Sequence, residues 1–148
     1  MRRIGLNICG LVILLVTSSC SREALELGGI DQIPDELGDW ACYYSLDEWT
    51  LSKGDYVFVN DYYELGYINL NDTLERLIQM SADADAGQYR GDYFEEYYSN
   101  GILHIILASE ATGKTIGDKW EYKGELEITD VMGNTRTVNV VGECGYYQ

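Results

Sequence analysis

The residues with the clearest chemistry are four cysteines and an acidic segment in the middle of the chain. Cys42 and Cys144 lie near the first and last expected strands, which often sit side by side, so in an exported protein we expect a disulfide between them. Two separately buried thiols are the alternative, because a sequence does not give the distance between two Cα atoms. Cys9 and Cys20 belong to the N-terminal segment and are interpreted with it below.

The acidic segment has the spacing of a calcium-binding loop. Positions 1, 3, 5, 7, 9 and 12 of that template correspond to Ser81, Asp83, Asp85, Gly87, Tyr89 and Asp92. The fit is incomplete, because Ala86 stands where the template requires glycine and Asp92 replaces the bidentate glutamate. A solvated acidic loop is the simpler interpretation. Calcium held by Asp83, Asp85 and Asp92 is the alternative, and we expect no other cofactor.

No local motif indicates catalysis. His104 is the only histidine, and its apolar surroundings in the sequence predict a packed side chain rather than a catalytic base. Glu95 and Glu96 are neighbours in a predicted strand, so their carboxylates point to opposite faces and cannot act as a glycosidase pair. We therefore expect a non-catalytic protein. A small envelope hydrolase that uses carboxylates scattered along the chain is the alternative.

The first nineteen residues have the composition of a secretory signal. Arg2 and Arg3 precede an apolar core over Ile8–Val16, and the small residues Ser18 and Ser19 follow. The apolar stretch is shorter than the roughly 20 residues that a transmembrane helix needs. We therefore expect the segment to be cleaved.

The end of this signal resembles the lipobox of bacterial lipoproteins. Ser18, Ser19 and Cys20 match the two small residues and the cysteine, whereas Thr17 departs from the usual apolar residue. The resemblance implies that Cys20 becomes the N-terminus and carries a thioether-linked diacylglycerol, and that the partner of this end is a membrane. Ser21 after the cysteine implies the outer membrane of a two-membrane cell envelope. Plain secretion after Ser19 is the alternative.

The remaining chain divides into a tether and one domain. Residues 1–19 form the signal, residues 20–37 mix charge with Gly28-Gly29 and the only proline, and residues 38–148 form a single β domain. The signal holds two of the ten basic residues and none of the 25 acidic ones, so the mature chain has a formal net charge of −17. That charge excludes nucleic acid as a favourable partner. An envelope protein or a glycan, bound by exposed tyrosines, is the partner class that we expect.

Alternating and β-branched residues predict an all-β fold. The clearest alternation has Trp120, Tyr122, Leu126 and Ile128 on the buried face, and a turn over 130–134 leads to a last strand. Strand patterns also extend from Trp40 through Trp49-Thr50-Leu51 to Leu70. One short helix is predicted near residues 72–82, because Asp72 to Glu75 resembles a capping box and Leu74, Leu77 and Ile78 follow at helical spacing.

Two weak resemblances leave the architecture open. The hairpin over 126–140 is similar to the closing hairpin of bacterial immunoglobulin-like domains, which implies an antiparallel β-sandwich. Gly38-Asp39-Trp40 resembles the G-x-W start of lipocalin-like domains, which implies a small β-barrel. We therefore expect a lipid-anchored binding or assembly domain, with a lipocalin-like carrier of a small apolar ligand as an alternative.

Overall fold

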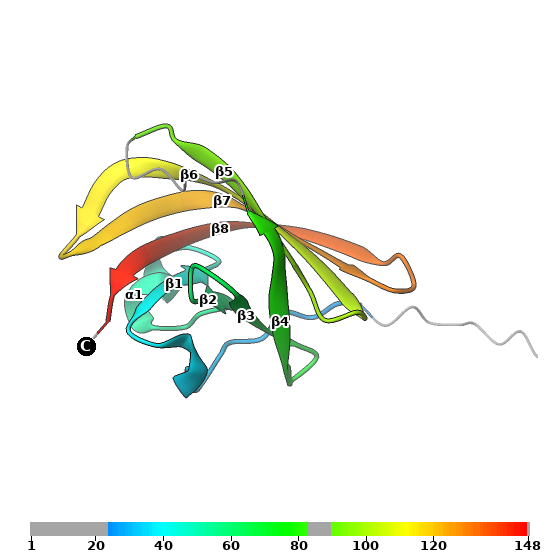
Figure 1. Cartoon of the computed structure of the whole chain (residues 1–148). Helices are drawn as coiled ribbons and strands as arrows, with labels where there is room; N and C mark the ends of the chain where they lie inside the picture. Colours follow the sequence, from blue (N-terminus) through cyan, green and yellow to red (C-terminus); the bar gives the residue numbers. More distant parts are fainter. Residues whose placement is uncertain (1–23, 83–89, 148) are drawn as a thin grey trace, which may run out of the picture.

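Eight antiparallel strands form a closed barrel in the computed structural model, which describes residues 24–82 and 90–147. Each strand pairs with the next, and β1 pairs with β8 to complete the ring (Figure 1). The strands are β1 (Trp40–Ser45), β2 (Phe58–Asn60), β3 (Leu65–Leu70), β4 (Thr73–Ala82), β5 (Tyr93–Ser99), β6 (Leu103–Ile116), β7 (Lys119–Asp130) and β8 (Thr135–Tyr146). Of the two architectures that the sequence left open, the chain adopts the barrel.

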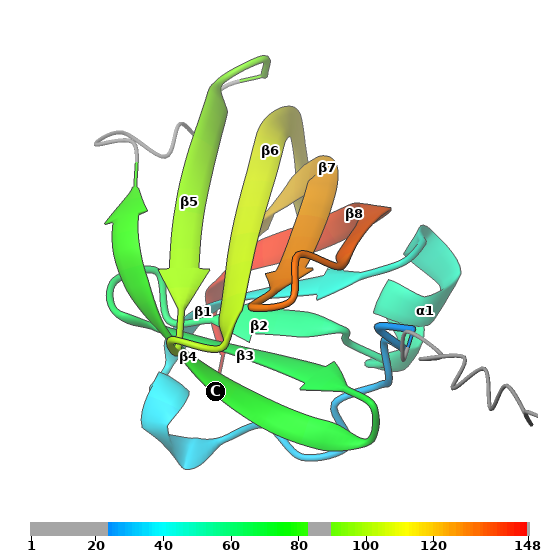
Figure 2. The ribbon, with the colours of Figure 1, turned by 90° about the vertical axis from the view of Figure 1, so that its right-hand side faces the viewer.

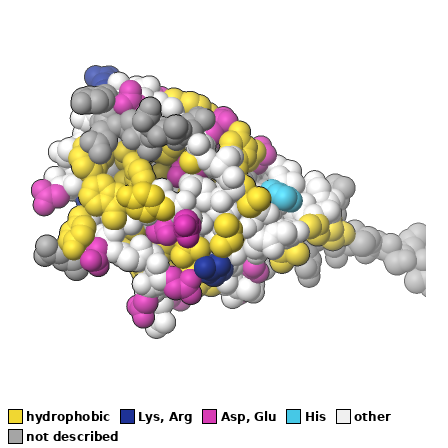
Figure 3. All heavy atoms as spheres, in the orientation of Figure 1, with side chains coloured by type: hydrophobic (Ala, Val, Ile, Leu, Met, Phe, Trp, Pro, Cys, Tyr) yellow, Lys and Arg dark blue, Asp and Glu magenta, His cyan; other side chains and the backbone are white. Residues whose placement is uncertain are grey.

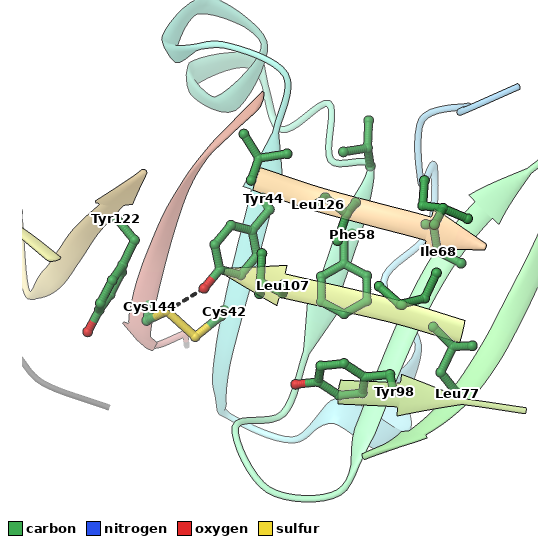
Figure 4. Packing of buried hydrophobic residues seen from close by; sticks show 14 of the residues in the cluster. Cys42, Tyr44, Phe58, Ile68, Leu77, Tyr98, Leu107, Tyr122, Leu126 and Cys144 are labelled. Carbon is green, nitrogen blue, oxygen red and sulfur yellow. Dashed lines mark hydrogen bonds between the residues drawn. A yellow bond between two sulfur atoms is a disulfide. The ribbon is translucent and has the colours of Figure 1, made fainter. Parts of the chain in front are cut away.

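The main core fills the inside of the barrel. Successive residues of a strand face opposite sides of a sheet, so every second side chain points inward. Tyr122, Leu126 and Ile128 are fully buried, which confirms the alternation predicted for β7. Aromatic and aliphatic side chains from the other strands pack around them, among them Tyr44, Phe58, Ile68, Leu77, Tyr98 and Leu107 (Figure 4).

A second, smaller core lies outside the barrel. Residues 30–37 lie against the outer faces of β1, β2 and β3 and include a short 3-10 helix, η1 (Asp35–Leu37), whereas Leu25 and Leu27 before them pack against the main core. Ile30 and Leu37 are buried there against Tyr43. Tyr43 and Tyr44 are consequently both buried, although they point to opposite faces of β1. This segment therefore packs as part of the folded body.

The predicted disulfide is present. Cys42 on β1 and Cys144 on β8 are directly opposite in the strand register, and their sulfur atoms are bonded. The bond therefore joins the two strands whose pairing closes the barrel.

The helix predicted near residues 72–82 is wrong. That segment is β4, in which Leu77 points inward and is fully buried while Leu74 and Ile78 point outward. Asn71 and Asp72 both have positive φ, the conformation of a two-residue hairpin turn between β3 and β4. The spacing of Leu74, Leu77 and Ile78 suits a helix, but the hydrogen bonds that this segment makes with β3 and β5 favour the strand.

The one α-helix in the described ranges lies where the sequence suggested a strand. α1 (Glu48–Lys53) connects β1 and β2 on the outside of the ring of strands (Figure 2). Asp47 caps it by accepting a hydrogen bond from Thr50 N at 2.8 Å, while the Thr50 hydroxyl lies 3.2 Å from Asp47 N and accepts its hydrogen bond. Gly54 ends the helix in the left-handed conformation. Among the residues described, no helix has the length and apolar character that a bilayer crossing requires.

Candidate functional site

The structure describes some of the predicted site residues and not others. Cys20, Asp83 and Asp85 lie outside the described residues. Asp92 is described, and it lies just before β5, where its backbone carbonyl accepts a hydrogen bond from Ala111 N at 2.9 Å. Within 24–82 and 90–147, no group of three or more histidine, cysteine, aspartate or glutamate side chains is arranged to hold a metal ion.

The two neighbouring glutamates of β5 have contrasting environments. Glu95 points outward, where the hydroxyls of Tyr93 and Tyr97 donate to it at 2.8 and 2.7 Å and lower its pKa. Glu96 points into the barrel and is only 6% exposed. His104 is exposed on β6, which corrects the expectation of a packed histidine. The two carboxylates on opposite faces therefore cannot act together, as predicted.

Glu96 is held by three donors inside the barrel. Gln79 Nε2 donates at 3.0 Å, the Tyr98 hydroxyl at 3.1 Å and Asn60 Nδ2 at 3.4 Å. A change of register between Gln79 and Ser81 marks a β-bulge in β4 at this point. Strands β2, β4 and β5 thus each contribute a polar side chain to one cluster, which we call the Glu96 cluster (Asn60, Gln79, Glu96 and Tyr98).

The proton affinity of Glu96 is unusual for a glutamate. Burial disfavours the charged carboxylate and raises its pKa to about 7. The hydrogen bonds from Tyr98, Gln79 and Asn60 lower the pKa and offset part of this effect, whereas the negative charge of Asp61 raises it further. Glu96 therefore exchanges its proton near neutral pH.

The charge of the Glu96 carboxylate affects the pKa of four tyrosine hydroxyls. The pKa values of Tyr44, Tyr62, Tyr98 and Tyr122 are all raised, mainly by burial and further by the nearby negative charge of Glu96. The hydroxyls of Tyr62 and Tyr122 are also hydrogen-bonded to each other. The barrel interior thus combines one ionisable acid with hydroxyls that can both donate and accept hydrogen bonds.

Three aromatic side chains lie at the end of the barrel where β1 and β7 begin. The Trp40 ring centroid is 5.9 Å from that of Trp120 and 6.4 Å from that of Tyr62. All three are partly buried and extend the apolar interior toward solvent. We call Trp40, Tyr62 and Trp120 the aromatic rim.

The aromatic rim is connected to the Glu96 cluster through Asn60. The Asn60 side-chain oxygen accepts a hydrogen bond from Tyr62 N at 3.2 Å, while the Asn60 amide nitrogen donates to Glu96. Tyr62 has a φ of 72°, a left-handed conformation that costs a residue with a side chain on the order of 1 kcal/mol. Strained backbone of this kind is common at binding sites. One side chain therefore links the strained rim residue to the buried carboxyl.

A groove on the outer face of β6, β7 and β8 offers a second candidate surface. It consists of two adjoining pockets of about 440 and 470 Å³ that share Glu110, Lys123 and Val141. Gly124 lies beneath it, and a Cβ atom there would collide with the Ala108 carbonyl, so only glycine permits this close approach of β6 and β7. Lysine and glutamate side chains both line the groove, so it has no strong preference for one sign of charge.

Comparisons with known proteins do not place this chain. No protein-family model matches it, and neither the curated proteins nor the solved structures contain a significant match. The case for function therefore depends on the chain's own residues.

The Glu96 cluster was missed in the sequence, although one signal for it was present. Phe94, Glu96 and Tyr98 alternate along β5, so an inward Phe94 requires an inward Glu96. Asn60 and Gln79 gave no comparable signal, because only the closed barrel brings β2 and β4 next to that carboxyl.

Proposed function

We propose that this protein is a bacterial envelope lipoprotein, anchored through Cys20, whose barrel binds a small ligand at the aromatic rim without catalysing a reaction. The lipobox-like Ser18-Ser19-Cys20 supports the anchor, and the serine that follows supports the outer membrane. The disulfide between Cys42 and Cys144 supports folding in an oxidising compartment outside the cytoplasm.

The observation that carries the binding proposal is the buried carboxyl of Glu96. An apolar side chain at this inward position would stabilise the core without the cost of burying an ionisable group. Ionisable groups whose pKa is shifted by burial are frequent at functional sites. The connection through Asn60 to the strained Tyr62 places this group next to the part of the barrel that ligand could reach from solvent.

The surroundings of Glu96 favour binding over hydrolysis. Its hydrogen-bond partners in the described residues are two amides and a hydroxyl rather than a histidine or a second carboxyl. The charge of Asp61 raises the pKa of Glu96, but the Asp61 carboxylate already accepts hydrogen bonds from the backbone N–H groups of Tyr63, Glu64 and Leu65. A hydrolase would need a second group free to act with Glu96.

The chemistry of the site indicates the class of ligand. A carboxylate with adjacent amide and tyrosine groups suits an ammonium or a hydroxyl-rich group. The aromatic rim suits the flat face of a sugar or the positive charge of an amine. An amino sugar or a small organic amine satisfies both parts, whereas a purely apolar ligand would leave Glu96 without a role.

Fluorescence can test binding, since Trp40 and Trp120 lie in the aromatic rim and Trp49 lies on α1. Titration with glucosamine and with tetramethylammonium should change the tryptophan emission. Glu96→Gln should weaken binding at least tenfold, whereas Glu95→Gln, the outward neighbour, should not. Equal binding by both variants, or no emission change with either probe, would contradict the proposed ligand class.

A separate measurement tests the anchor. The mass of the protein from bacterial membranes should equal that of residues 20–148 plus a diacylglyceryl group and an N-terminal acyl chain. Release of an unmodified chain, or retention of Met1, would refute lipidation without affecting the binding result.

The outer groove is a second candidate site, favoured by its volume. An envelope protein or glycan strand is the occupant that suits a long surface of mixed charge. The Lys123 side chain makes no ion pair or hydrogen bond with the described residues, so Lys123→Glu is the variant that should weaken such a complex while leaving glucosamine binding unchanged.

A further inference from the structure

Two neighbouring turns expose apolar side chains at one end of the barrel. Ile102 in the β5–β6 turn is 55% exposed, and Val131 and Met132 in the β7–β8 turn are 65% and 72% exposed. Val131 N donates a hydrogen bond to the Ile102 carbonyl at 3.1 Å, so the two turns lie side by side. We call these three residues the tip patch, and Figure 3 shows hydrophobic side chains at this end of the molecule.

The turns that carry the tip patch are held in fixed conformations. The Asp130 carboxylate accepts hydrogen bonds from Met132 N at 2.9 Å and Asn134 N at 2.8 Å. The Asn100 side chain accepts from Ile102 N at 3.1 Å and from Leu103 N at 2.9 Å. Such turns usually carry polar residues. The apolar side chains are therefore presented to the exterior at little cost in chain entropy.

The N-terminal segment reaches the folded body beside the tip patch. Arg136 Nη1 donates a hydrogen bond to the Leu25 carbonyl, and Arg136 pairs with Ile128 near the turn of the β7–β8 hairpin. Figure 1 shows the start of the described chain and the β5–β6 and β7–β8 turns at one end, with α1 at the other. Leu25 is thus fixed next to the same hairpin that carries Val131 and Met132.

The length of chain before Leu25 limits the distance to an anchor. Leu25 is five residues after Cys20 in the sequence, and five steps of fully extended chain span about 18 Å at most. If Cys20 carries lipid, as proposed above, the bilayer surface lies within that distance of Leu25, whose carbonyl accepts the hydrogen bond from Arg136. Beyond Arg136 the hairpin has one more strand pair, Thr129 with Thr135, before the turn over 130–134. At about 3.3 Å per residue, Met132 lies within about 13 Å of Arg136 along the hairpin.

We propose that the tip patch inserts into the interfacial layer of the bilayer that holds the Cys20 lipid, which orients the barrel with α1 away from the membrane. This inference rests on the proposed lipidation. The acidic body is not attracted to anionic headgroups, so apolar contact rather than charge must hold the barrel against the surface. A second copy of the chain is the competing occupant.

The test uses the full chain, processed in bacteria and reconstituted into phosphatidylcholine vesicles, with an environment-sensitive fluorophore on Met132→Cys. The same label on Trp49→Cys, exposed on α1, is the control. Label at 132 should emit at shorter wavelength with at least twofold higher intensity, and nitroxide lipids should quench it. Label at 49 should remain unchanged. Adding Ile102→Ser and Val131→Ser should reduce the quenching at 132 by at least half.

The mass of the same protein separates the two proposals. If Cys20 is lipidated but the labels at 132 and 49 behave alike, membrane insertion of the tip patch is refuted and the anchor stands. If the label at 132 brightens without quenching by nitroxide lipids, a protein contact covers the patch and the insertion is also refuted. If Cys20 is unmodified, both proposals fail.

Discussion

Cys42 and Cys144 face each other across the only strand pair of the described barrel that joins the beginning of the fold to its end. Their disulfide closes a loop with a sequence separation of 102 residues. All other neighbouring strands are also neighbours in sequence, so the β1–β8 pairing carries the largest entropic cost of loop closure in the barrel. The disulfide therefore joins the strand pair at which a covalent bond stabilises the fold most, because it removes the largest loss of chain entropy on closure.

The double variant Cys42→Ala/Cys144→Ala should therefore be strongly destabilised. For a loop of this length, chain-entropy arguments give a loss of about 5 kcal/mol in the free energy of unfolding. Denaturant titration of the variant and of the oxidised protein measures the difference. Reducing agent should destabilise the native protein by a similar amount and leave the variant unchanged; a loss below about 1 kcal/mol would show that strand pairing alone closes the barrel.

A glycine allows Tyr44 to pack beside that same strand pair. A Cβ atom at Gly142 would overlap the ring of Tyr44, whose hydroxyl lies 3.8 Å from Cys144 Sγ. Gly142→Ala should therefore reduce stability by about 1–3 kcal/mol, the usual cost of overpacking a core. Thermal unfolding provides the measurement. In a Tyr44→Leu background the same substitution should be much less harmful, and an undiminished effect would point to the backbone instead.

The sequence predicted strands best where one face of the sheet is wet. Along β7, Trp120, Tyr122, Leu126 and Ile128 alternate with charged residues, and this period of two has no helical alternative. β4 has no such clarity, because its outward Leu74 and Ile78 are apolar and create a helical spacing with Leu77. Whether such a segment becomes a strand depends on the strands that pair with it, here β3 and β5, and the spacing of apolar residues in the sequence carries no information about those partners.

The candidate site was harder to predict than the fold. Asn60, Gln79 and Glu96 come from three strands separated by 17 to 36 residues and meet only after the barrel closes. The helix α1 was also predicted wrongly, as strand, although its capping signal is local: Asp47 and Thr50 are three residues apart and Gly54 follows the helix. Local signals predict element ends, whereas a buried cluster requires the topology.

Arg136 should control how firmly the N-terminal segment is held. Arg136→Ala removes the hydrogen bond to the Leu25 carbonyl, while Gly28 N keeps its bond to the Asn69 carbonyl at 3.0 Å. We expect faster amide exchange at residues 24–27 with a change in global stability of less than about 1 kcal/mol. Arg76→Ala, which removes the exposed ion pair with Glu36, is the control and should leave exchange at 24–27 unaltered. Identical exchange in both variants would exclude this role of Arg136.

Glu96 should make the stability of the barrel fall as pH rises toward neutrality. Its pKa is about 7 in the folded protein against an ordinary value of 4.5, so the folded state holds a proton that the unfolded state releases between these values. The neutral carboxyl is fully accommodated below pH 4.5, and the penalty for burying the charge grows until the pH passes 7. The shift corresponds to a loss on the order of 3 kcal/mol across this window.

Glu96→Gln should abolish this pH dependence, because glutamine keeps the shape and hydrogen-bonding capacity of the neutral acid. Denaturant titrations at pH 4.5 and pH 8 should show the variant close to the native protein at the lower pH and more stable at the higher pH. Glu95→Gln gives the opposite pattern, since hydrogen bonds from Tyr97 and Tyr93 lower the pKa of Glu95 and its contribution is lost as the pH falls through that value. If Glu96→Gln differed equally from the native protein at both pH values, the carboxyl would be charged throughout, and a neutral-pH proton exchange inside the barrel would be excluded.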